Sequence, residues 1–164
     1  MNRVAVSATE DVPLPKWTAP LKRYALKVLA MLGKDKWDLS VVLCGDKTIM
    51  ALNSQYRGKS EPTDVLSFSL DEGEMFPGSN RSNSKRRLPG DIVISLDTLK
   101  ENARHFAIDE DEELRRLLIH GILHLDGMDH QSNSETEPML QLQERTLKKL
   151  ADERIFGGMH ESSF

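Results

Sequence analysis

The sequence predicts an α/β or α+β domain in which a small mixed sheet is covered by helices. Short apolar runs typical of strands are interspersed with longer segments whose apolar residues recur at helical spacing. The length of 164 residues is enough for one domain with one hydrophobic core. With 38% apolar and 29% charged residues, the composition is that of an ordinary globular protein rather than a disordered one.

The N-terminal half contains three predicted strands and two predicted helices. Residues 3–7 and 39–43 are short strand-like runs, and residues 16–32 carry apolar side chains on one helical face until Gly33 ends the helix. Asp46 is placed to cap a helix over about residues 47–56. Residues 64–70 alternate as in a strand with two different faces, one with Val65, Ser67 and Ser69 and the other with Leu66, Phe68 and Leu70.

The C-terminal half contains one predicted strand, residues 92–94, and three predicted helices. An apolar stripe predicts a helix from Ser95 to about His105, and the acidic residues 109–113 favour the N-terminus of the next helix. A last helix is expected to open at Ser134, with Glu137 completing a capping box. Residues 157–164 are expected to form a flexible tail, so the single domain is predicted to span residues 1–156.

Between two of these strands, residues 71–89 are rich in Gly, Ser, Asn and Pro, which predicts a long mobile loop. This loop carries the basic cluster Arg81, Lys85, Arg86 and Arg87. The cluster is either a solvated surface or a flap that grips RNA. The net charge of −4 argues against a globally basic nucleic-acid binder, but a local RNA-binding surface depends on the distribution of charge rather than its sum.

Several features indicate a cytoplasmic protein. No apolar run has the roughly 20 residues needed to span a bilayer, and the N-terminus lacks a signal-peptide pattern. The single cysteine, Cys44, excludes an internal disulfide framework, and its apolar neighbours favour a buried, inert thiol. We therefore expect neither a membrane partner nor a disulfide-linked one.

Three of the five histidines fall within eleven residues and predict a site for one Zn²⁺. His120 and His124 are four residues apart on a predicted helix, so both rings project from one face. Gly127 allows the helix to end in a left-handed turn, which can bring His130 back to the same point. Three imidazoles with a fourth position left for water form the ligand set of a catalytic zinc, whereas a structural site usually has four protein ligands.

The spacing of these histidines equals that of the metzincin peptidases, which place a glutamate after the first histidine as the general base. Here that position is Gly121, which has no proton acceptor. A catalytic zinc can activate water without a neighbouring carboxylate. Asp126 and Asp129 are candidates to orient a histidine or to replace the base, although for Asp126 a surface turn position is the preferred interpretation.

Three segments match the motifs of a known protein family, in residue types and in order along the chain. The run His-Gly-Ile-Leu-His-Leu-Asp-Gly-Met-Asp-His at 120–130 is similar to the family pattern H-G-x-L-H-L-x-G-x-D-H. Residues 53–59 (Asn-Ser-Gln-Tyr-Arg-Gly-Lys) with 62–68 (Pro-Thr-Asp-Val-Leu-Ser-Phe), and residues 88–95 (Leu-Pro-Gly-Asp-Ile-Val-Ile-Ser), resemble two further family blocks. The matches extend from about residue 39 to residue 150 in the family order, and the family that they resemble is the YbeY family of bacterial endoribonucleases.

The resemblance implies a four-stranded sheet with several helices, zinc held by His120, His124 and His130, and endonucleolytic cleavage of single-stranded RNA. It also implies a role in maturation of the 3′ end of the small-subunit ribosomal RNA and in ribosome quality control, with the small ribosomal subunit as partner. Arg57 is the implied active-site arginine. This agrees with the ability of a guanidinium to bind two phosphoryl oxygens as their negative charge develops.

Some alternatives remain open at this point. Zinc can assist attack by hydroxide or by the ribose 2′-hydroxyl, and the sequence does not choose between them. A metallopeptidase-like hydrolase follows from the metzincin spacing, with Gly121 against it. A non-enzymatic, zinc-containing ribosome-assembly factor is the other alternative, with the open ligand position against it. Thr63, Asp64 and Asp91 are interpreted as structural, because strand entries and turns use such side chains for backbone hydrogen bonds.

Overall fold

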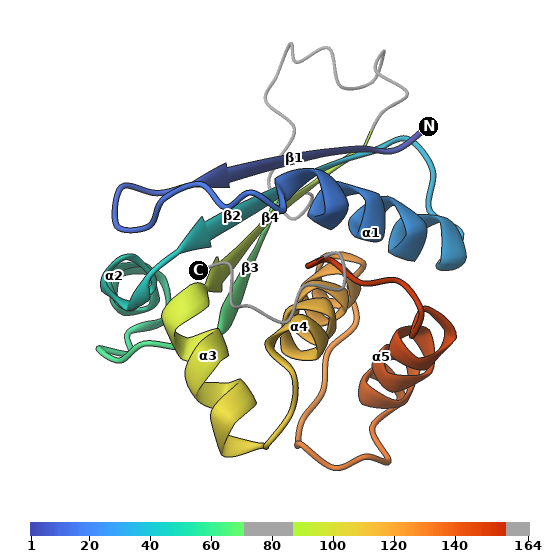
Figure 1. The fold of residues 1–164 in the computed structure, drawn as a ribbon. Coiled ribbons are helices and arrows are strands. Elements are labelled where there is room, and N and C mark those ends of the chain that lie inside the picture. The colour runs from blue at the N-terminus through green and yellow to red at the C-terminus, as the bar shows by residue number, and fades with distance from the viewer. Residues whose placement is uncertain (71–86, 157–164) are drawn as a thin grey trace, which may run out of the picture.

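A computed structural model describes residues 1–70 and 87–156 (Figure 1). Within these ranges it confirms the predicted number and order of strands and helices. In chain order the elements are β1 (Arg3–Ala8), α1 (Thr18–Met31), β2 (Trp37–Cys44), α2 (Asp46–Arg57), β3 (Val65–Ser69), β4 (Arg87–Ser95), α3 (Leu96–His105), α4 (Glu110–Leu125) and α5 (Pro138–Lys149). No described helix is long and apolar enough to cross a membrane.

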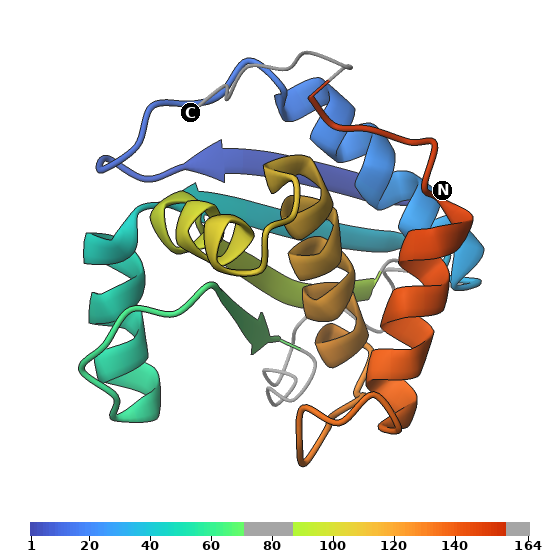
Figure 2. The same ribbon diagram turned by 60° about the horizontal axis from the view of Figure 1, so that its bottom comes forward.

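The strands form one mixed sheet in the order β1-β2-β4-β3. The pairs β1–β2 and β2–β4 are parallel, whereas β3 lies antiparallel to β4 at the edge. Helix α4 crosses one face of the sheet and contacts both β3 and β4, with α1, α3 and α5 beside it (Figure 2). The predicted α+β architecture is therefore confirmed, and it places α4 next to the edge strand β3.

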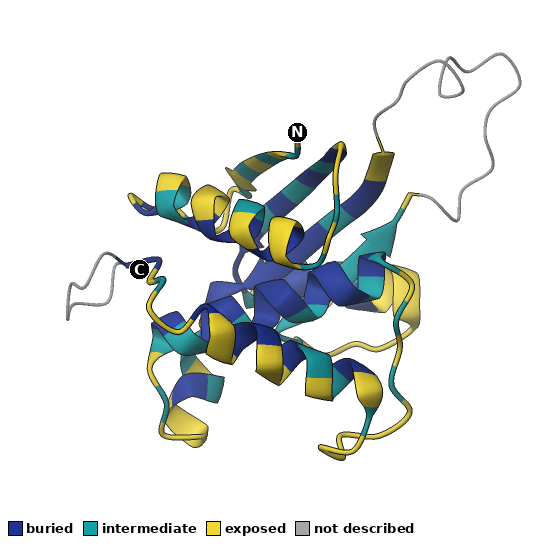
Figure 3. Ribbon diagram, turned by 90° about the vertical axis from the view of Figure 1, so that its right-hand side faces the viewer, coloured by how far each residue is buried: buried dark blue, intermediate teal, exposed yellow. Residues whose placement is uncertain are grey.

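The two faces of the sheet have separate apolar cores. The main core lies between the sheet and helices α1, α4 and α5, and its fully buried members include Leu43, Ile92 and Ile122. Helix α4 is buried along most of its length (Figure 3). A smaller cluster on the opposite face joins Ile49 of α2 to Leu66 and Val93. This division matches the alternation along the strands, since adjacent residues of a strand point to opposite faces.

The start of α2 corrects one prediction. Asp46 does not cap the helix; it is the first helical residue, and its carboxylate accepts hydrogen bonds from the hydroxyls of Ser95 and Thr98. The cap is Asp11, which follows β1 and accepts hydrogen bonds from the backbone N–H groups of Gly45 and Thr48, both at 3.1 Å. A side chain distant in sequence therefore satisfies the free N–H groups of this helix end.

The predicted capping box of the last helix is also wrong. Helix α5 begins at Pro138, and the residue before a proline is disfavoured in helical conformation, so Glu137 lies outside the helix with ψ 128°. Its carboxylate instead accepts hydrogen bonds from the backbone N–H and the hydroxyl of Ser132. Ser134 accepts a hydrogen bond from the N–H of Thr136 within the same turn.

Strand β4 begins at Arg87, so residues 87–89, predicted as loop, belong to the sheet. The guanidinium of Arg87 lies over the ring of Trp37, 5.0 Å from its centroid. The remaining basic residues Arg81, Lys85 and Arg86, the body of the predicted loop and the predicted tail at 157–164 lie outside the described residues. Cys44 is fully buried, as predicted, and burial raises the pKa of its thiol to about 12, which agrees with an inert thiol.

Candidate metal centre and the two clefts beside it

The turn after α4 is left-handed at Gly127, as the sequence predicts. Gly127 adopts φ 92°, and its N–H donates to the carbonyl of His124 at 2.9 Å, while the N–H of Met128 donates to the carbonyl of Leu123 at 3.0 Å. These two bonds satisfy carbonyls that the helix end leaves free and reverse the chain direction. The reversal brings His130 back beside the last two turns of α4.

The three predicted histidines meet at one point. One ring nitrogen from each of His120, His124 and His130 lies within 4.8 Å of the others, and all three side chains are partly buried. The Nε2 atoms of His120 and His124 are 3.1 Å apart. This is the only such group of metal-ligand side chains within residues 1–70 and 87–156.

Each histidine is fixed by a hydrogen bond at Nδ1. The Nδ1 atoms of His120, His124 and His130 lie 2.7 Å from Oε1 of Gln143, 3.1 Å from the Met128 carbonyl and 2.9 Å from the Ser132 carbonyl, respectively. These oxygens only accept hydrogen bonds, so Nδ1 carries the proton in every ring. In a neutral imidazole with its proton on Nδ1, the Nε2 atom offers its lone pair to a metal ion.

The separation of the His120 and His124 rings suits a shared metal ion. Two unprotonated nitrogens 3.1 Å apart repel each other unless a cation lies between them. A tetrahedral zinc with Zn–N bonds of about 2.0–2.1 Å holds its ligand nitrogens about 3.3 Å apart, which is close to the observed separation. Burial lowers the pKa of both His120 and His124, and the neighbouring His120 lowers that of His124 further. Both effects favour the neutral imidazole that binds metal.

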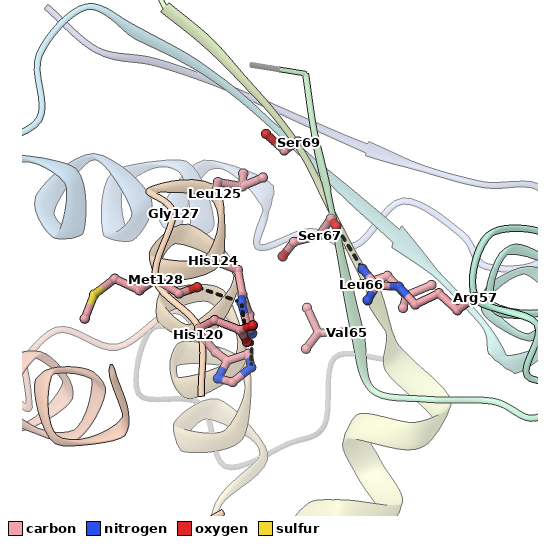
Figure 4. A pocket seen from close by; sticks show the side chains of 11 residues that line it. Arg57, Val65, Leu66, Ser67, Ser69, His120, His124, Leu125, Gly127 and Met128 are labelled. Carbon is pink, nitrogen blue, oxygen red and sulfur yellow. Dashed lines mark hydrogen bonds and ion pairs between the residues drawn. The ribbon is translucent and has the colours of Figure 1, made fainter. Parts of the chain in front are cut away.

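The first cleft, of about 430 Å³, is open on the side of α4 that faces β3. Its lining includes His120 and His124, the strand residues Ser67 and Ser69, and Arg57 at the end of α2. Figure 4 shows Arg57 and the two histidines on opposite sides of Val65 and Ser67. Arg57 is exposed, and its Nη2 donates to the Ser67 carbonyl at 3.2 Å. Most of its donors therefore face solvent and the cleft.

Gly121 determines how closely α4 approaches the sheet. A Cβ atom at this position would lie 2.8–3.0 Å from side-chain atoms of Ile92, which is fully buried in β4. The Ser67 hydroxyl also donates to the Gly121 carbonyl at 3.4 Å. The small size of Gly121 thus lets the histidine-bearing helix lie directly on β3 and β4. The same residue also lacks a proton acceptor.

We call His120, His124 and His130 the metal cluster. The second cleft, of about 470 Å³, lies on the other side of this cluster and is lined by His120 and His130. A polar network forms part of its wall. The Asn102 amide nitrogen donates to the carboxylates of Asp64 and Glu113, at 3.0 and 3.3 Å. Glu113 is 4% exposed, and burial raises the pKa of its carboxyl.

The two aspartates next to the histidines have different environments. Asp126 forms ion pairs with Lys34 at 2.7 Å and Arg87 at 3.8 Å, away from the rings, which agrees with its interpretation as a turn residue. Asp129 lines the first cleft, and its Oδ1 is 4.0 Å from Nδ1 of His124.

Of the three residues interpreted as structural, Asp64 makes the expected hydrogen bond between a side chain and the backbone. Asp64, at the start of β3, accepts a hydrogen bond from the N–H of Val65 at 2.8 Å, as expected for a strand entry. The hydroxyl of Thr63 donates to the same carboxylate at 3.5 Å. Asp91 lies within β4, opposite Phe68 of β3.

Sequence reasoning missed the residues that orient the histidines and line the second cleft. Gln143 lies one turn into α5, at a spacing that no metal motif includes. Asn102 and Glu113 come from α3 and α4 and meet only in the folded chain. The remaining histidine of the described residues, His105, lies at the end of α3 with its ring against Phe106, outside the metal cluster.

Comparisons with known proteins agree with this geometry. A family model described as Endoribonuclease YbeY matches residues 7–151. Endoribonuclease YbeY of Treponema pallidum (strain Nichols) is 46% identical over 147 residues, covering 90% of this chain and 89% of the relative. The protein of the same name from Treponema denticola is 41% identical over 155 residues, covering 94% and 97%. The solution structure of TM1509 from Thermotoga maritima has a TM-score of 0.61 at 28% identity, covering 93% of this chain and 91% of that one.

Proposed function

The chain belongs to the YbeY family of endoribonucleases, and from this membership we propose that it cuts single-stranded RNA with the help of one Zn²⁺. The substrate is ribosomal RNA, at the 3′ end of the small-subunit RNA and in defective ribosomes, and the partner is the small ribosomal subunit in the cytoplasm. The observation that carries the proposal is the cluster of three oriented histidines beside a cleft that contains an arginine.

Zinc would be held by Nε2 of His120, His124 and His130. When bound, it supplies a Lewis acid that activates water or polarises the scissile phosphate. The protein keeps the three lone pairs directed at the metal through the hydrogen bonds at Nδ1, made by Gln143 and by two backbone carbonyls. Such outer hydrogen bonds fix the ring orientation and increase the basicity of the ligand nitrogen.

Arg57 would bind the phosphate of the bond to be cut. Breaking a phosphodiester increases negative charge on the phosphoryl oxygens, and a guanidinium can donate to two of them at once. One donor of Arg57 is held by the Ser67 carbonyl, which fixes the side chain at the rim of the first cleft. Asp129 is the one carboxylate among the described residues that line this cleft, so it is the candidate proton acceptor there.

The packing of α4 argues against a metallopeptidase. The general base of the metzincin peptidases is the residue after the first histidine. In this chain a side chain at that position would collide with Ile92 of β4. Position 121 therefore has neither the peptidase base nor the space for one, whereas Arg57 supplies a cation suited to the charge that develops in phosphodiester cleavage.

Two variants test this proposal. We expect His124→Ala to lose zinc binding and RNA cleavage together, because it removes one of three ligands. We expect Arg57→Ala to keep one zinc per chain and to lower kcat by about 10²–10³-fold, the usual cost of removing one donor that stabilises transition-state charge. Zinc content and cleavage of a single-stranded ribosomal RNA fragment are measured on the same samples.

Lys47→Ala is the matched control, because it removes an exposed cation at the other end of α2. It should cleave at the wild-type rate. Cleavage that survives in His124→Ala would contradict the role of zinc, and unchanged cleavage in Arg57→Ala would contradict the role of the arginine.

A further inference from the structure

The metal cluster lies between two clefts whose lining side chains carry opposite charge. Both clefts are lined by His120 and by Val65 of β3, so a ligand at the metal can extend into both. The first contains the exposed cation Arg57. The second contains two carboxylates, those of Asp64 and Glu113. A nucleotide strand that crosses the metal would therefore meet a phosphate-binding cleft on one side and an anion-repelling cleft on the other.

The cation of the second cleft is not available for phosphate. Nε of Arg116 donates to Glu144 at 3.0 Å, and its Nη1 donates to Glu112 at 3.2 Å. A second bond joins Nη2 to Glu144 at 3.0 Å. Nη1 also forms an ion pair with Oε1 of Glu113 at 3.7 Å, so this one guanidinium is shared by three carboxylates and the second cleft keeps an excess of acidic groups.

The polar wall of the second cleft offers hydrogen-bond acceptors. Both amide hydrogens of Asn102 are directed at carboxylates, Asp64 at 3.0 Å and Glu113 at 3.3 Å. This orientation leaves the Asn102 Oδ1 atom without a hydrogen bond from the described part of the chain. Carboxylate and amide oxygens side by side select a ligand that donates N–H groups.

The same cleft also offers an aromatic surface. Phe106 follows Asn102 by four residues, so both side chains lie on the same side of the end of α3. It is 62% exposed and lines the cleft, together with the apolar residues Ile108, Leu117 and Leu140. An exposed aromatic ring beside acceptor groups is the combination that binds a single-stranded base, by stacking and by hydrogen bonds to its edge.

We propose that the second cleft binds the nucleobase next to the scissile phosphate, and that it prefers bases with an exocyclic amine, such as adenine and cytosine, over their oxo counterparts hypoxanthine and uracil. This inference rests on the proposed function. Phe106 stacks on the base, while Asn102 and the carboxylates accept hydrogen bonds from its amine. The acidic wall repels phosphate and so directs the sugar–phosphate backbone towards Arg57.

The experiment measures binding of fluorescein-labelled single-stranded RNA pentamers to the zinc-loaded protein by fluorescence anisotropy, and gel electrophoresis of the same samples reports whether the pentamers are cut. In the pairs A₅ against I₅ and C₅ against U₅, an exocyclic amine that donates two hydrogens is replaced by an oxo group that only accepts, while the adjacent ring nitrogen becomes a single N–H donor. The oxo group would face the carboxylate and amide oxygens of the cleft, which are also acceptors. We expect the amino member of each pair to bind about tenfold more tightly, since a lost hydrogen bond leaves a polar group of the cleft without a partner. Phe106→Ala should weaken binding of all four pentamers about tenfold, and Phe106→Tyr should restore it.

Two controls separate this inference from the proposed function. Leu14→Ala removes an equally exposed apolar side chain outside both clefts and should bind as the wild type does. Arg57→Ala should lower the affinity for all four pentamers. The ratio of the affinities for the amino and oxo members of each pair should stay the same. The base subsite alone is overturned by either of two results in a protein that still binds and cuts RNA. One is equal affinity for the two members of each pair, and the other is unchanged binding in Phe106→Ala. Absence of both RNA binding and cleavage overturns the subsite together with the proposed function.

Discussion

At the scale of single residues, Gln143 has a larger role than its position in the sequence indicates. Its Oε1 accepts from Nδ1 of His120, and its Nε2 donates to Glu144 at 3.0 Å, which fixes the orientation of the amide. Because the amide oxygen can only accept, it keeps the proton on Nδ1 of His120. The side chain is 7% exposed, so water does not easily replace this contact.

We predict that Gln143→Leu lowers the affinity for zinc by about 10–100-fold, the usual effect of removing a partner of a metal-bound histidine. The affinity is measured by competition with a chromophoric chelator. Gln141→Leu, an exposed change on the same helix, is the control. Equal affinities of Gln143→Leu and the wild type would contradict the orienting role.

Asp11 gives a prediction about pH. Burial alone would raise the pKa of its carboxyl, but hydrogen bonds from Thr9, Thr48 and Gly45 together hold it below the ordinary value of 3.8. A carboxyl whose pKa is lowered by folding stabilises the protein above its unfolded pKa, and this stabilisation is lost as the pH falls through the folded pKa. We expect Asp11→Ala to lower the free energy of unfolding by about 1 kcal/mol at pH 7.

Urea unfolding of the wild type and Asp11→Ala between pH 7 and pH 2 checks this expectation. The difference between the two proteins should stay constant down to about pH 4, near the ordinary pKa of the carboxyl, and shrink at lower pH. A difference that is unchanged at pH 2 would mean that the charge of Asp11 does not contribute to the cap.

At the scale of elements, the position of α4 depends on the glycine that faces the sheet. Alanine is preferred over glycine by up to about 1 kcal/mol in a helix interior. At position 121, however, the new methyl group would meet the fully buried Ile92 at 2.8 Å. Overpacking of this kind typically costs about 1–3 kcal/mol, so the collision outweighs the gain in helix propensity.

We therefore predict that Gly121→Ala lowers the free energy of unfolding by about 1–2 kcal/mol. In an Ile92→Ala background, which removes the contacting atoms, the same change should become neutral or stabilising. A double-mutant cycle measured by urea denaturation gives this coupling. Additive effects of the two changes would show that α4 does not lie as close to β4 as described.

The elements themselves could be predicted from the sequence because their signals are local. The alternation in residues 64–70 and the glycine at 127 each determine backbone and burial within a few positions. The cap of α2 could not be predicted in the same way. Asp11 lies 34 and 37 positions from the N–H groups that it caps. The histidine ligand set followed from spacing, whereas Gln143 and the second cleft depend on contacts between distant helices.

At the scale of the whole molecule, α4 connects the site to the rest of the fold. Near its N-terminus, Asp111 is fully buried and accepts from Arg115 at 2.6 Å. The same carboxylate accepts from the backbone N–H groups of Ile155 and Phe156, at 2.9 and 2.8 Å. The C-terminal segment is thereby attached to the helix whose other end carries the histidines. The site and the core consequently share one structural element.

The most direct test of the whole account combines metal analysis with RNA cleavage on one preparation of the purified wild-type chain. The account predicts one zinc ion per chain, loss of cleavage of single-stranded ribosomal RNA when a chelator removes the zinc, and recovery when zinc is added back. Undiminished cleavage by protein shown to contain no zinc would contradict it.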